Sequence, residues 1–192
     1  MIKDDIITFG NYNWRVLDTK DDKILIITEK IIELRWYNKE FVEITWADCE
    51  LRKYLNNEFY NTFNQDEKAR ILTVANRNPD NPWFKTKGGI DTTDNIFLLS
   101  LEQVCQYFGD SSENLQNKGS QKWYIEDGNN GKRQAKFGND YHWWRLRSSG
   151  YYSRTAASVS SNGNVYVRGN GVYGRPRDGG GVRPALWLNL KN

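Results

Sequence analysis

WWRLRS at residues 143–148 and GVRPALWL at residues 181–188 are the two apolar motifs on which the fold of this chain depends. Eight of the sixteen glycines lie from Gly150 to Gly181, where they separate short apolar and β-branched runs. Short strands divided by Gly and Asn turns are typical of an antiparallel sheet. In this last part of the chain we expect strands at residues 141–146, 156–159, 165–168 and 182–190.

Alternation along these strands separates core positions from surface positions. In residues 165–168 it places both valines in the core and Tyr166 and Arg168 outside. In the strand before it, the same pattern places Ser158 outside. The loop at residues 161–164 contains Asn-Gly, which predicts a tight hairpin between the two strands.

The first sixty residues combine a hairpin signal with a helical one. Residues 12–17 and 23–28 are β-branched, aromatic or alternating around a polar turn, and residues 31–36 are expected to extend the same sheet. Thr45 is expected to cap a helix over residues 46–55, whose apolar spacing approximates an amphipathic stripe.

Two capping boxes place further helices. Residues 64–67 open a short helix, and residues 100–103 open a helix that ends at Gly109. Residues 76–94 are rich in Asn, Pro, Asp and Gly, which predicts a loop. The apolar run at residues 95–99 predicts a short buried strand.

One domain is expected to span residues 1–192, because a chain of 192 residues fits one domain better than two. An aromatic content of 14% is too high for a disordered chain. Residues 110–140 have no long apolar period, so we expect a surface insertion that is partly ordered by Trp123, Tyr124 and Phe137.

The net charge of +3 conceals an asymmetry along the chain. Residues 141–192 contain seven Arg, Lys191 and one acid, Asp178, and so carry +7, which leaves −4 on residues 1–140. Arg in place of Lys indicates stacking on aromatic rings, bidentate hydrogen bonding or burial. A solvated basic face is the simpler alternative.

Membrane insertion and export are not expected. The longest aliphatic run, residues 24–27, is far shorter than the roughly 20 residues of a membrane helix. The first nine residues do not place an apolar segment after a basic one, so no signal peptide is expected. A cytoplasmic or virion-associated location follows, unless a leader has been lost.

Several residues are expected to be structural. Arg183 is expected to make a structural hydrogen bond or ion pair. Cys49 and Cys105 do not form a metal-binding pair and are expected to be reduced and buried. A single histidine, His142, removes most zinc sites and histidine-rich catalysis. Three tryptophans are expected in the core: Trp143, Trp144 and Trp187.

The two C-terminal motifs belong to a longer pattern, which also contains WADCELRKYLN at residues 46–56 and TTDNIFLLS at residues 92–100. From Phe9 to Leu190 this pattern resembles a bacterial and phage-associated family of C-type-lectin-fold domains. That family is similar to the variable proteins of diversity-generating retroelements, which display hypervariable residues for ligand binding. One departure is Arg145, which is inserted into the family's WWLRS motif.

The resemblance implies an α+β domain with a C-type lectin fold, made of a small twisted antiparallel sheet, two main helices and a loop-rich C-terminal half. It also implies that residues 141–190 contain a variable region, with one of the two C-terminal motifs on each side of it. Residues 151–180 contain few amino-acid types, and substitution of the adenines in an Asn codon (AAY) can produce each of these types. Adenine substitutions are the kind that such retroelements introduce. The implied function is binding of a protein ligand, without catalysis, cofactor or metal.

The composition of this segment independently indicates a recognition surface. Tyr supplies large rigid contact area, Ser, Gly and Asn supply adaptable hydrogen bonds, and Arg supplies planar donors, as in antibody loops. Tyr and Arg are also frequent among binding hot spots. The expected ligand-binding residues are Tyr151, Tyr152, Ser153, Arg154, Ser158, Tyr166, Arg168, Asn170, Tyr173, Arg175, Arg177 and Asp178.

Two other binding functions stay open. Exposed Tyr or Trp rings stack on glycans without a metal, and interleaved Arg and Tyr residues bind nucleic acid. The acidic charge of residues 1–140 disfavours a broad nucleic-acid interface.

Catalysis and calcium binding are disfavoured. Formylglycine-generating and related oxidases share the broad fold, but they need a copper-binding cysteine pair or three iron-binding histidines. This chain has no cysteine after Cys105 and only one histidine. Calcium-dependent lectins use Glu-Pro-Asn or Gln-Pro-Asp together with Trp-Asn-Asp, and none of these motifs occurs here.

Overall fold

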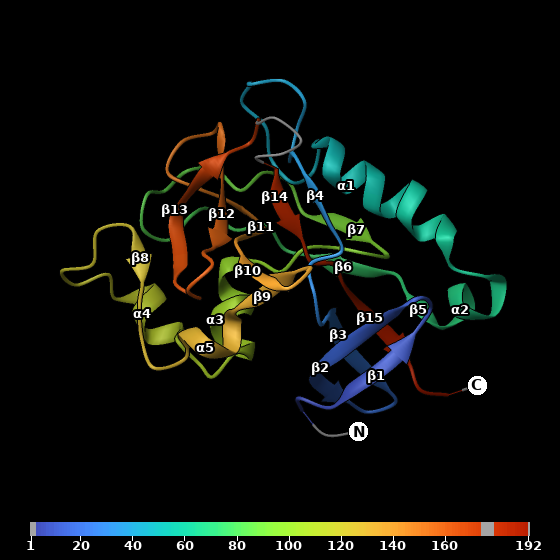
Figure 1. Cartoon of the computed structure of the whole chain (residues 1–192). Helices are drawn as coiled ribbons and strands as arrows, with labels where there is room; N and C mark the ends of the chain where they lie inside the picture. The colour runs from blue at the N-terminus through green and yellow to red at the C-terminus, as the bar shows by residue number, and fades with distance from the viewer. Residues whose placement is uncertain (1–2, 174–178, 192) are drawn as a thin grey trace.

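Two main sheets, two smaller two-stranded ladders and a set of short helices make up the computed structural model of this chain, which describes residues 3–173 and 179–191 (Figure 1). Strands dominate, and the helices are few and short, so the α+β class expected from the sequence is confirmed. No helix in the described ranges combines the length and the apolar character needed to cross a membrane.

The first sheet joins the two ends of the chain. Its order is β1-β2-β3-β15-β5, and each neighbouring pair is antiparallel. The expected N-terminal hairpin is confirmed, and Leu186 of the second motif pairs with Ile26 at its edge. The strands are β1 (Ile6–Phe9), β2 (Tyr12–Lys20), β3 (Lys23–Thr28), β5 (Ile71–Leu72) and β15 (Ala185–Asn189).

The second sheet has the order β4-β14-β11-β12-β13-β8, in which only β11 and β14 run parallel. Its central strands β11 and β12 are buried almost throughout, because both faces of the sheet are covered there. The strands are β4 (Glu33–Arg35), β8 (Tyr124–Ile125), β11 (Trp144–Ser149), β12 (Thr155–Val159), β13 (Val165–Gly171) and β14 (Gly180–Val182).

Four strand predictions need correction. Residues 141–146 do not form one strand, since Trp143 separates a short strand at residues 140–142 from β11, which belongs to another ladder. Residues 182–190 form two strands in different sheets, separated at Pro184, which has no N–H to donate to a ladder. Residues 31–36 do not extend the hairpin sheet, because β15 occupies that edge of β3, and β4 pairs with β14 instead. Residues 95–99 are largely buried as expected, but only Phe97 forms a bridge, to Ala185.

The helical predictions are confirmed at both capping boxes, which open α2 (Gln65–Arg70) and α3 (Leu101–Tyr107). The predicted start of the first helix is wrong. α1 (Glu50–Tyr54) begins after Cys49, whose Sγ accepts a hydrogen bond from the Arg52 N–H at 3.4 Å. Residues 45–49 form a turn before it, and a π turn (Leu55–Phe59) and a 3-10 turn (Tyr60–Thr62) continue it.

Two small ladders and the remaining helices complete the described chain. β6 and β7 lie at the two ends of the expected loop at residues 76–94, so that loop is shorter than predicted. These elements are β6 (Val74–Asn76), β7 (Thr92–Asp94), β9 (Ala135–Phe137), β10 (Asp140–His142), α4 (Ser112–Gln116) and α5 (Asn130–Arg133).

Residues 110–140 are more integrated than a surface insertion. β8 pairs with β13, and Ile125 of β8 is fully buried. Arg133 is also fully buried, where it donates to Asp127 at 2.7 Å and to the Gly163 carbonyl at 2.9 Å. Single buried anchors of this kind have no sequence period, which is why the pattern missed them. Trp123, Tyr124 and Phe137, expected to order the segment, are all exposed.

Three arginines of the C-terminal part lie in the interior, so the burial interpretation holds for these three. Arg145, Arg147 and Arg183 are at most 4% exposed, and burial lowers the pKa of each to about 10. The structural role predicted for Arg183 is confirmed, because its Nε donates to the Thr28 carbonyl at 2.8 Å.

The three tryptophans of the motifs are unequally buried. Trp144 is fully buried, as expected, and its Nε1 donates to the Arg133 carbonyl at 3.0 Å. Trp143 and Trp187 are only half-buried, which corrects the prediction. Trp143 lies between β10 and β11, and the ring of Trp187 is near the ammonium groups of exposed Lys20 and half-buried Lys23.

Gly163 in the Asn-Gly hairpin cannot carry a side chain without strain. Its φ is +87°, and a Cβ would lie 1.9 Å from the backbone oxygen of Asn130. We expect Gly163→Ala to lower the free energy of unfolding by about 3 kcal/mol, since conformational strain adds to the clash. Gly138→Ala is the matched control, because Gly138 has a φ of +63° with nothing within 4 Å. Equal losses in urea unfolding of the two variants would contradict the clash.

Both cysteines are free and buried, as predicted. Burial raises the pKa of the Cys49 and Cys105 thiols to about 12, and only the thiolate is reactive. We expect no rapid labelling by a thiol reagent at mildly alkaline pH until urea unfolds the chain. Fast labelling of the folded chain would contradict this burial.

The same thiols give a pH dependence. The folded chain holds both protons up to about pH 12, whereas an ordinary thiol loses its proton near 9. Their contribution to stability is therefore complete below pH 9 and is lost as the pH rises toward 12. Urea unfolding across this range should show a shallower decline for the Cys49→Ala/Cys105→Ala variant. A parallel decline would rule out the thiols as its cause.

Candidate functional site

A groove of about 550 Å³ lies at the outer edge of the second sheet. Four segments that are far apart in sequence build it: the turn after Asn81, residues 118–123, the loop between β11 and β12, and β13. Figure 1 shows β8, β12 and β13 together on this side of the molecule. The residues that line this aromatic groove are Phe84, Lys118, Gly119, Gln121, Lys122, Trp123, Tyr151, Tyr152 and Arg168.

Backbone contacts hold the loop between β11 and β12, which contains Tyr151 and Tyr152, against β13. The N–H of Tyr151 donates to the Arg168 carbonyl at 2.8 Å, and the Tyr151 carbonyl accepts from Thr86 Oγ1 at 2.7 Å. The loop can approach this closely because Gly150 precedes it, and a Cβ there would lie 2.2 Å from the Arg168 oxygen. Tyr151 and Tyr152 are therefore presented on a fixed backbone.

Asn81 ties the second wall of the groove to the sheet. It is 1% exposed, and its Nδ2 donates to the carbonyls of Ser149 at 2.9 Å and Val167 at 3.1 Å. Its Oδ1 accepts from the N–H groups of Trp83 and Phe84 at 3.0 and 3.2 Å. One buried amide thus positions the Phe84 ring, in an Asn-Pro turn that sequence reasoning treated only as a loop.

Aromatic rings enclose a single guanidinium in the groove. The Arg168 guanidinium carbon lies 4.5 Å from the ring centroid of Trp123 and 5.7 Å from that of Tyr151. Tyr151 in turn makes edge contacts with Phe84 at 4.7 Å and with Tyr152 at 4.3 Å. Trp123 is 45% exposed and Tyr152 57% exposed, so the assembled rings remain open to solvent.

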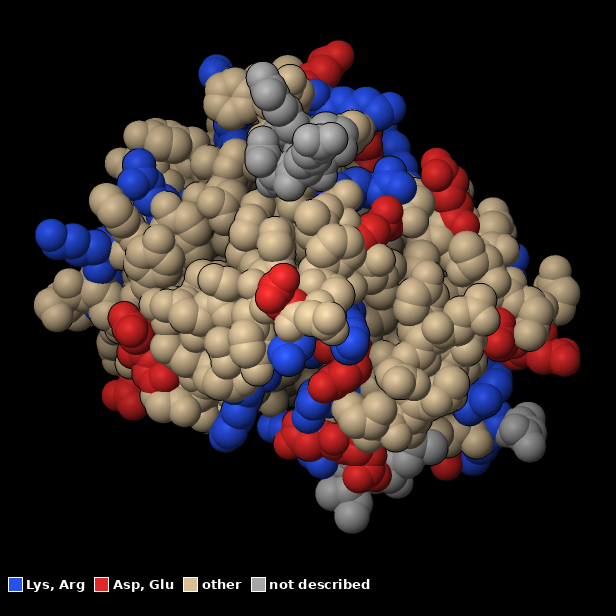
Figure 2. Space-filling view, viewed as in Figure 1, with Lys and Arg blue, Asp and Glu red and all other residues tan. Residues whose placement is uncertain are grey.

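The groove is positively charged. Its lining includes Lys118, Lys122 and Arg168 and no carboxylate. Lys118 Nζ lies 5.0 Å from the Phe84 ring centroid, so this cation also stands beside an aromatic face. In Figure 2, the region where Figure 1 places β8, β12 and β13 is tan and blue, whereas acidic side chains lie below it.

A smaller hollow of about 270 Å³ continues the groove beyond Tyr152, which lines both. There the Arg154 guanidinium lies 5.4 Å from the ring of Phe41, a side chain that is 57% exposed. Ser153 also lines this hollow, and its carbonyl accepts from the Ile44 N–H at 3.0 Å. The two hollows adjoin at Tyr152, and together they present exposed rings and cations, with Glu43 as the acid of the smaller hollow.

The structure brings together five of the predicted binding residues. Tyr151, Tyr152 and Arg168 line the groove, and Ser153 and Arg154 line the adjoining hollow. The predicted residues Arg175, Arg177 and Asp178 lie outside the described residues.

Four predicted residues lie apart from this face. Ser158 is 1% exposed, which corrects its predicted surface position, and Asn170 Nδ2 donates to its hydroxyl at 2.9 Å. Tyr166 is half-buried and stacks on Tyr124 at 4.4 Å. Tyr173 is 54% exposed but lines neither hollow.

Besides Gly119 and Gln121, the groove contains four residues that sequence reasoning did not select, from segments assigned to a loop or an insertion. A local signal existed for two of them, because Lys122-Trp123 sets a cation beside an aromatic ring in a polar segment. The others become part of the site only through tertiary contacts. These four residues are Phe84, Lys118, Lys122 and Trp123.

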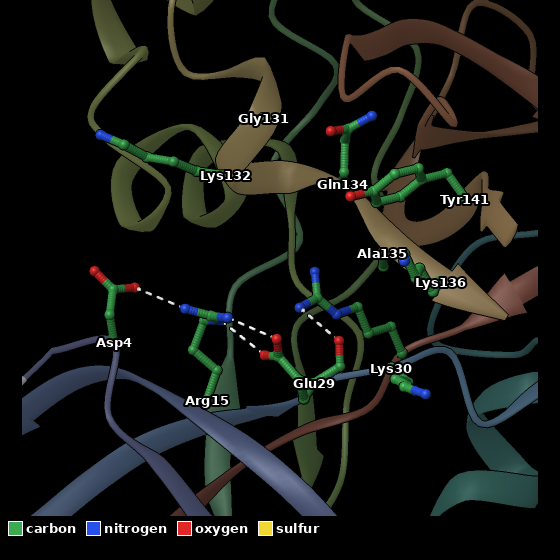
Figure 3. Close-up of a pocket in the computed structure, with 11 residues that line it drawn as sticks. Asp4, Arg15, Glu29, Lys30, Gly131, Lys132, Gln134, Ala135, Lys136 and Tyr141 are labelled. Atoms are coloured by element: carbon green, nitrogen blue, oxygen red, sulfur yellow. Dashed lines mark hydrogen bonds and ion pairs between the residues drawn. The ribbon is translucent and has the colours of Figure 1, made fainter. Parts of the chain in front are cut away.

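A second cavity, of about 520 Å³, lies between the first sheet and the β9 region. Figure 3 shows Asp4, Arg15 and Glu29 side by side along it. Arg15 donates to both Glu29 oxygens at 2.8 and 2.6 Å, and Arg183 donates to the Glu29 carbonyl at 3.3 Å. These charges satisfy one another and join chain segments, so we interpret this cavity as structural.

Residues suited to metal chemistry do not gather in the described part of the chain, which holds no cluster of three or more His, Cys, Asp or Glu residues. His142 lies outside both hollows, and its Nδ1 is 2.7 Å from the Trp143 carbonyl oxygen. The chemistry available in the groove is stacking, hydrogen bonding and charge pairing.

Comparison with known proteins gives one match. The family described as "Domain of unknown function (DUF6273)" matches residues 21–190. No curated protein and no solved structure matches the chain.

Proposed function

The chain belongs to the DUF6273 family of domains, and we propose that this member recognises a protein ligand through the aromatic groove, without catalysis. One observation carries the proposal. The Arg168 guanidinium lies 4.5 Å from the Trp123 ring centroid and 5.7 Å from that of Tyr151, on a surface where both rings are exposed. Tyr, Trp and Arg are the side chains that most often dominate binding energy.

Pre-organisation supports this function. The buried Asn81 amide and the Gly150 approach fix the rings before a partner arrives, so little side-chain and loop entropy is lost on binding. Such large apolar rings are otherwise costly to expose, and clustered exposed rings mark interaction sites.

The finer fold assignment is also a proposal. We propose a C-type lectin fold, related to the variable proteins of diversity-generating retroelements. The antiparallel sheet that joins the chain ends, the helices α1 and α3, and the loop-rich second half agree with the architecture that this resemblance implies. Of the two bracketing motifs, WWRLRS lies mainly in β11 of the second sheet, and GVRPALWL is divided between β14 of that sheet and β15 of the first.

Sequencing the locus across many cells of one population tests the retroelement proposal. Substitutions should be confined to adenine positions of codons 151–180, and they should fall on exposed residues such as Tyr151, Tyr152 and Arg154. Buried positions such as Val167 should stay constant. A uniform segment would overturn the retroelement assignment and leave a binding domain of fixed sequence.

A displayed random-peptide library tests groove-dependent protein binding. The folded chain is immobilised beside a Trp123→Ala/Tyr151→Ala variant and a Tyr141→Ala control, whose tyrosine is 52% exposed outside both hollows. We expect peptides that are enriched on the wild type and the control but not on the groove variant. Enrichment that is equal on all three would overturn the proposed function.

A further inference from the structure

We infer that the partner presents an acidic segment to the aromatic groove, with carboxylates facing Lys118, Lys122 and Arg168. The inference rests on the proposed function and names the chemistry of the partner. It starts from the charge of the groove, where three cations line the walls without an acid.

Several cations elsewhere in the described chain have carboxylate partners, whereas none of the three cations that line the groove has one. Arg15 pairs with Glu29 at 2.6 Å and Arg133 with Asp127 at 2.7 Å. Over residues 3–173 and 179–191, no ion pair within 4 Å involves a cation that lines the groove. The positive charge of this surface is therefore available to a partner.

The surroundings of Arg168 suit a carboxylate. Its guanidinium carbon lies over the Trp123 ring, 4.5 Å from the centroid, and a planar guanidinium keeps its N–H donors in its own plane. The Arg168 side chain has no hydrogen-bond partner in the part of the chain that the structure describes, while the main-chain N–H donates to the Trp123 carbonyl at 3.3 Å. A carboxylate accepts two parallel bonds from the edge of such a plane.

The size and charge of the face favour a peptide over nucleic acid. Three cations around a groove of about 550 Å³ neutralise a few carboxylates, whereas a nucleic-acid strand needs a basic stripe that follows its backbone. The adjoining hollow includes Glu43, which would repel a continuing phosphate backbone. A peptide with acids at one end can place uncharged residues there.

The enriched library peptides provide the probe for this inference. We expect them to be rich in Asp and Glu and poor in Lys and Arg. The most enriched peptide is compared, by fluorescence anisotropy, with the same peptide carrying Asn and Gln in place of its acids. The acidic form should bind at least about tenfold more tightly, and its advantage should shrink as salt is added.

Charge reversal in the chain is the complementary measurement. Lys118→Glu/Lys122→Glu should weaken the acidic peptide at least about tenfold and the neutral form far less. Lys30→Glu/Lys53→Glu is the matched control, because both lysines are exposed, unpaired in the described residues and outside the groove, and the change in net charge is identical. If the control loses the same affinity for the acidic peptide, the effect comes from net charge alone, and the inference is overturned.

Other outcomes separate this inference from the proposed function. Groove-dependent peptides that are neutral or basic would overturn the acidic partner and leave the proposed function standing. Tighter binding of oligothymidylate or of a uronic-acid oligosaccharide than of the acidic peptide would overturn the acidic protein segment in favour of those ligands. If the library yields no peptide whose binding depends on the groove, both the proposed function and the acidic partner are overturned.

Discussion

Arg147→Ala is expected to lower the free energy of unfolding by about 4 kcal/mol. The substitution removes one guanidinium that donates hydrogen bonds to several acceptors, which would be left without a partner. The Arg147 guanidinium donates to the Leu98 carbonyl at 2.8 Å and to the Arg77 carbonyl and Asn78 Oδ1 at 3.2 Å each. It also donates to Gln103 Oε1. These partners belong to the segments around β6 and α3, so the loss would loosen their attachment to β11.

Two further variants separate the causes of this loss. Arg147→Met keeps most of the apolar contact but no donor, so it should lose nearly as much stability as the alanine variant in urea unfolding. Arg154→Ala removes an exposed arginine of the same C-terminal part and should change stability by less than about 0.5 kcal/mol. A stable Arg147→Met variant would show that packing, and not hydrogen bonding, is the role of this residue.

Trp123→Ala/Tyr151→Ala is expected to weaken the most enriched library peptide by roughly a hundredfold or more, since truncation of each hot-spot residue costs about 2 kcal/mol. Arg168 would also lose both rings that hold its guanidinium plane. Calorimetric titration measures the affinity, and thermal unfolding checks that the fold persists. Because both side chains are exposed, we expect little change in the unfolding temperature.

Tyr141→Ala is the control for loss of an exposed aromatic ring, and it should leave the affinity within about twofold, because no groove contact involves it. A comparable loss in the control would show that binding depends on general surface aromaticity. An unfolding temperature that falls only in the double variant would instead assign Trp123 and Tyr151 to the stability of the second sheet.

Local signals account for what could be read from the chain alone. The capping boxes of α2 and α3 lie within four residues, and the β2–β3 hairpin depends on a turn between adjacent runs, so these elements follow from neighbouring side chains. The sequence predicts the start of the first helix too early. Thr is a common capping residue, so Thr45 is the expected cap, but the Cys49 thiol caps the helix instead. Propensity alone does not identify such a cap.

Part of the candidate site was also accessible from composition. Tyr151, Tyr152 and Arg168 stand out in a Gly-rich segment with the alphabet of recognition loops. Ser158 was misassigned because alternation assumes that one face of a strand meets water. β12 lies in the middle of its sheet, and its residues from Ala156 to Val159 are buried on both faces.

Residue types and short-range spacing thus specify the α+β class, the N-terminal hairpin, the two capped helices, the strands β12 and β13, and the aromatic, arginine-rich character of the surface. Tertiary structure alone decides that GVRPALWL divides between two sheets and that the ring of Trp123 meets Arg168, 45 positions along the chain, at 4.5 Å. The physical reason is that pairing partners and groove walls are chosen by burial and by free sheet edges across long loops. No periodicity within a segment records which distant segment will cover it.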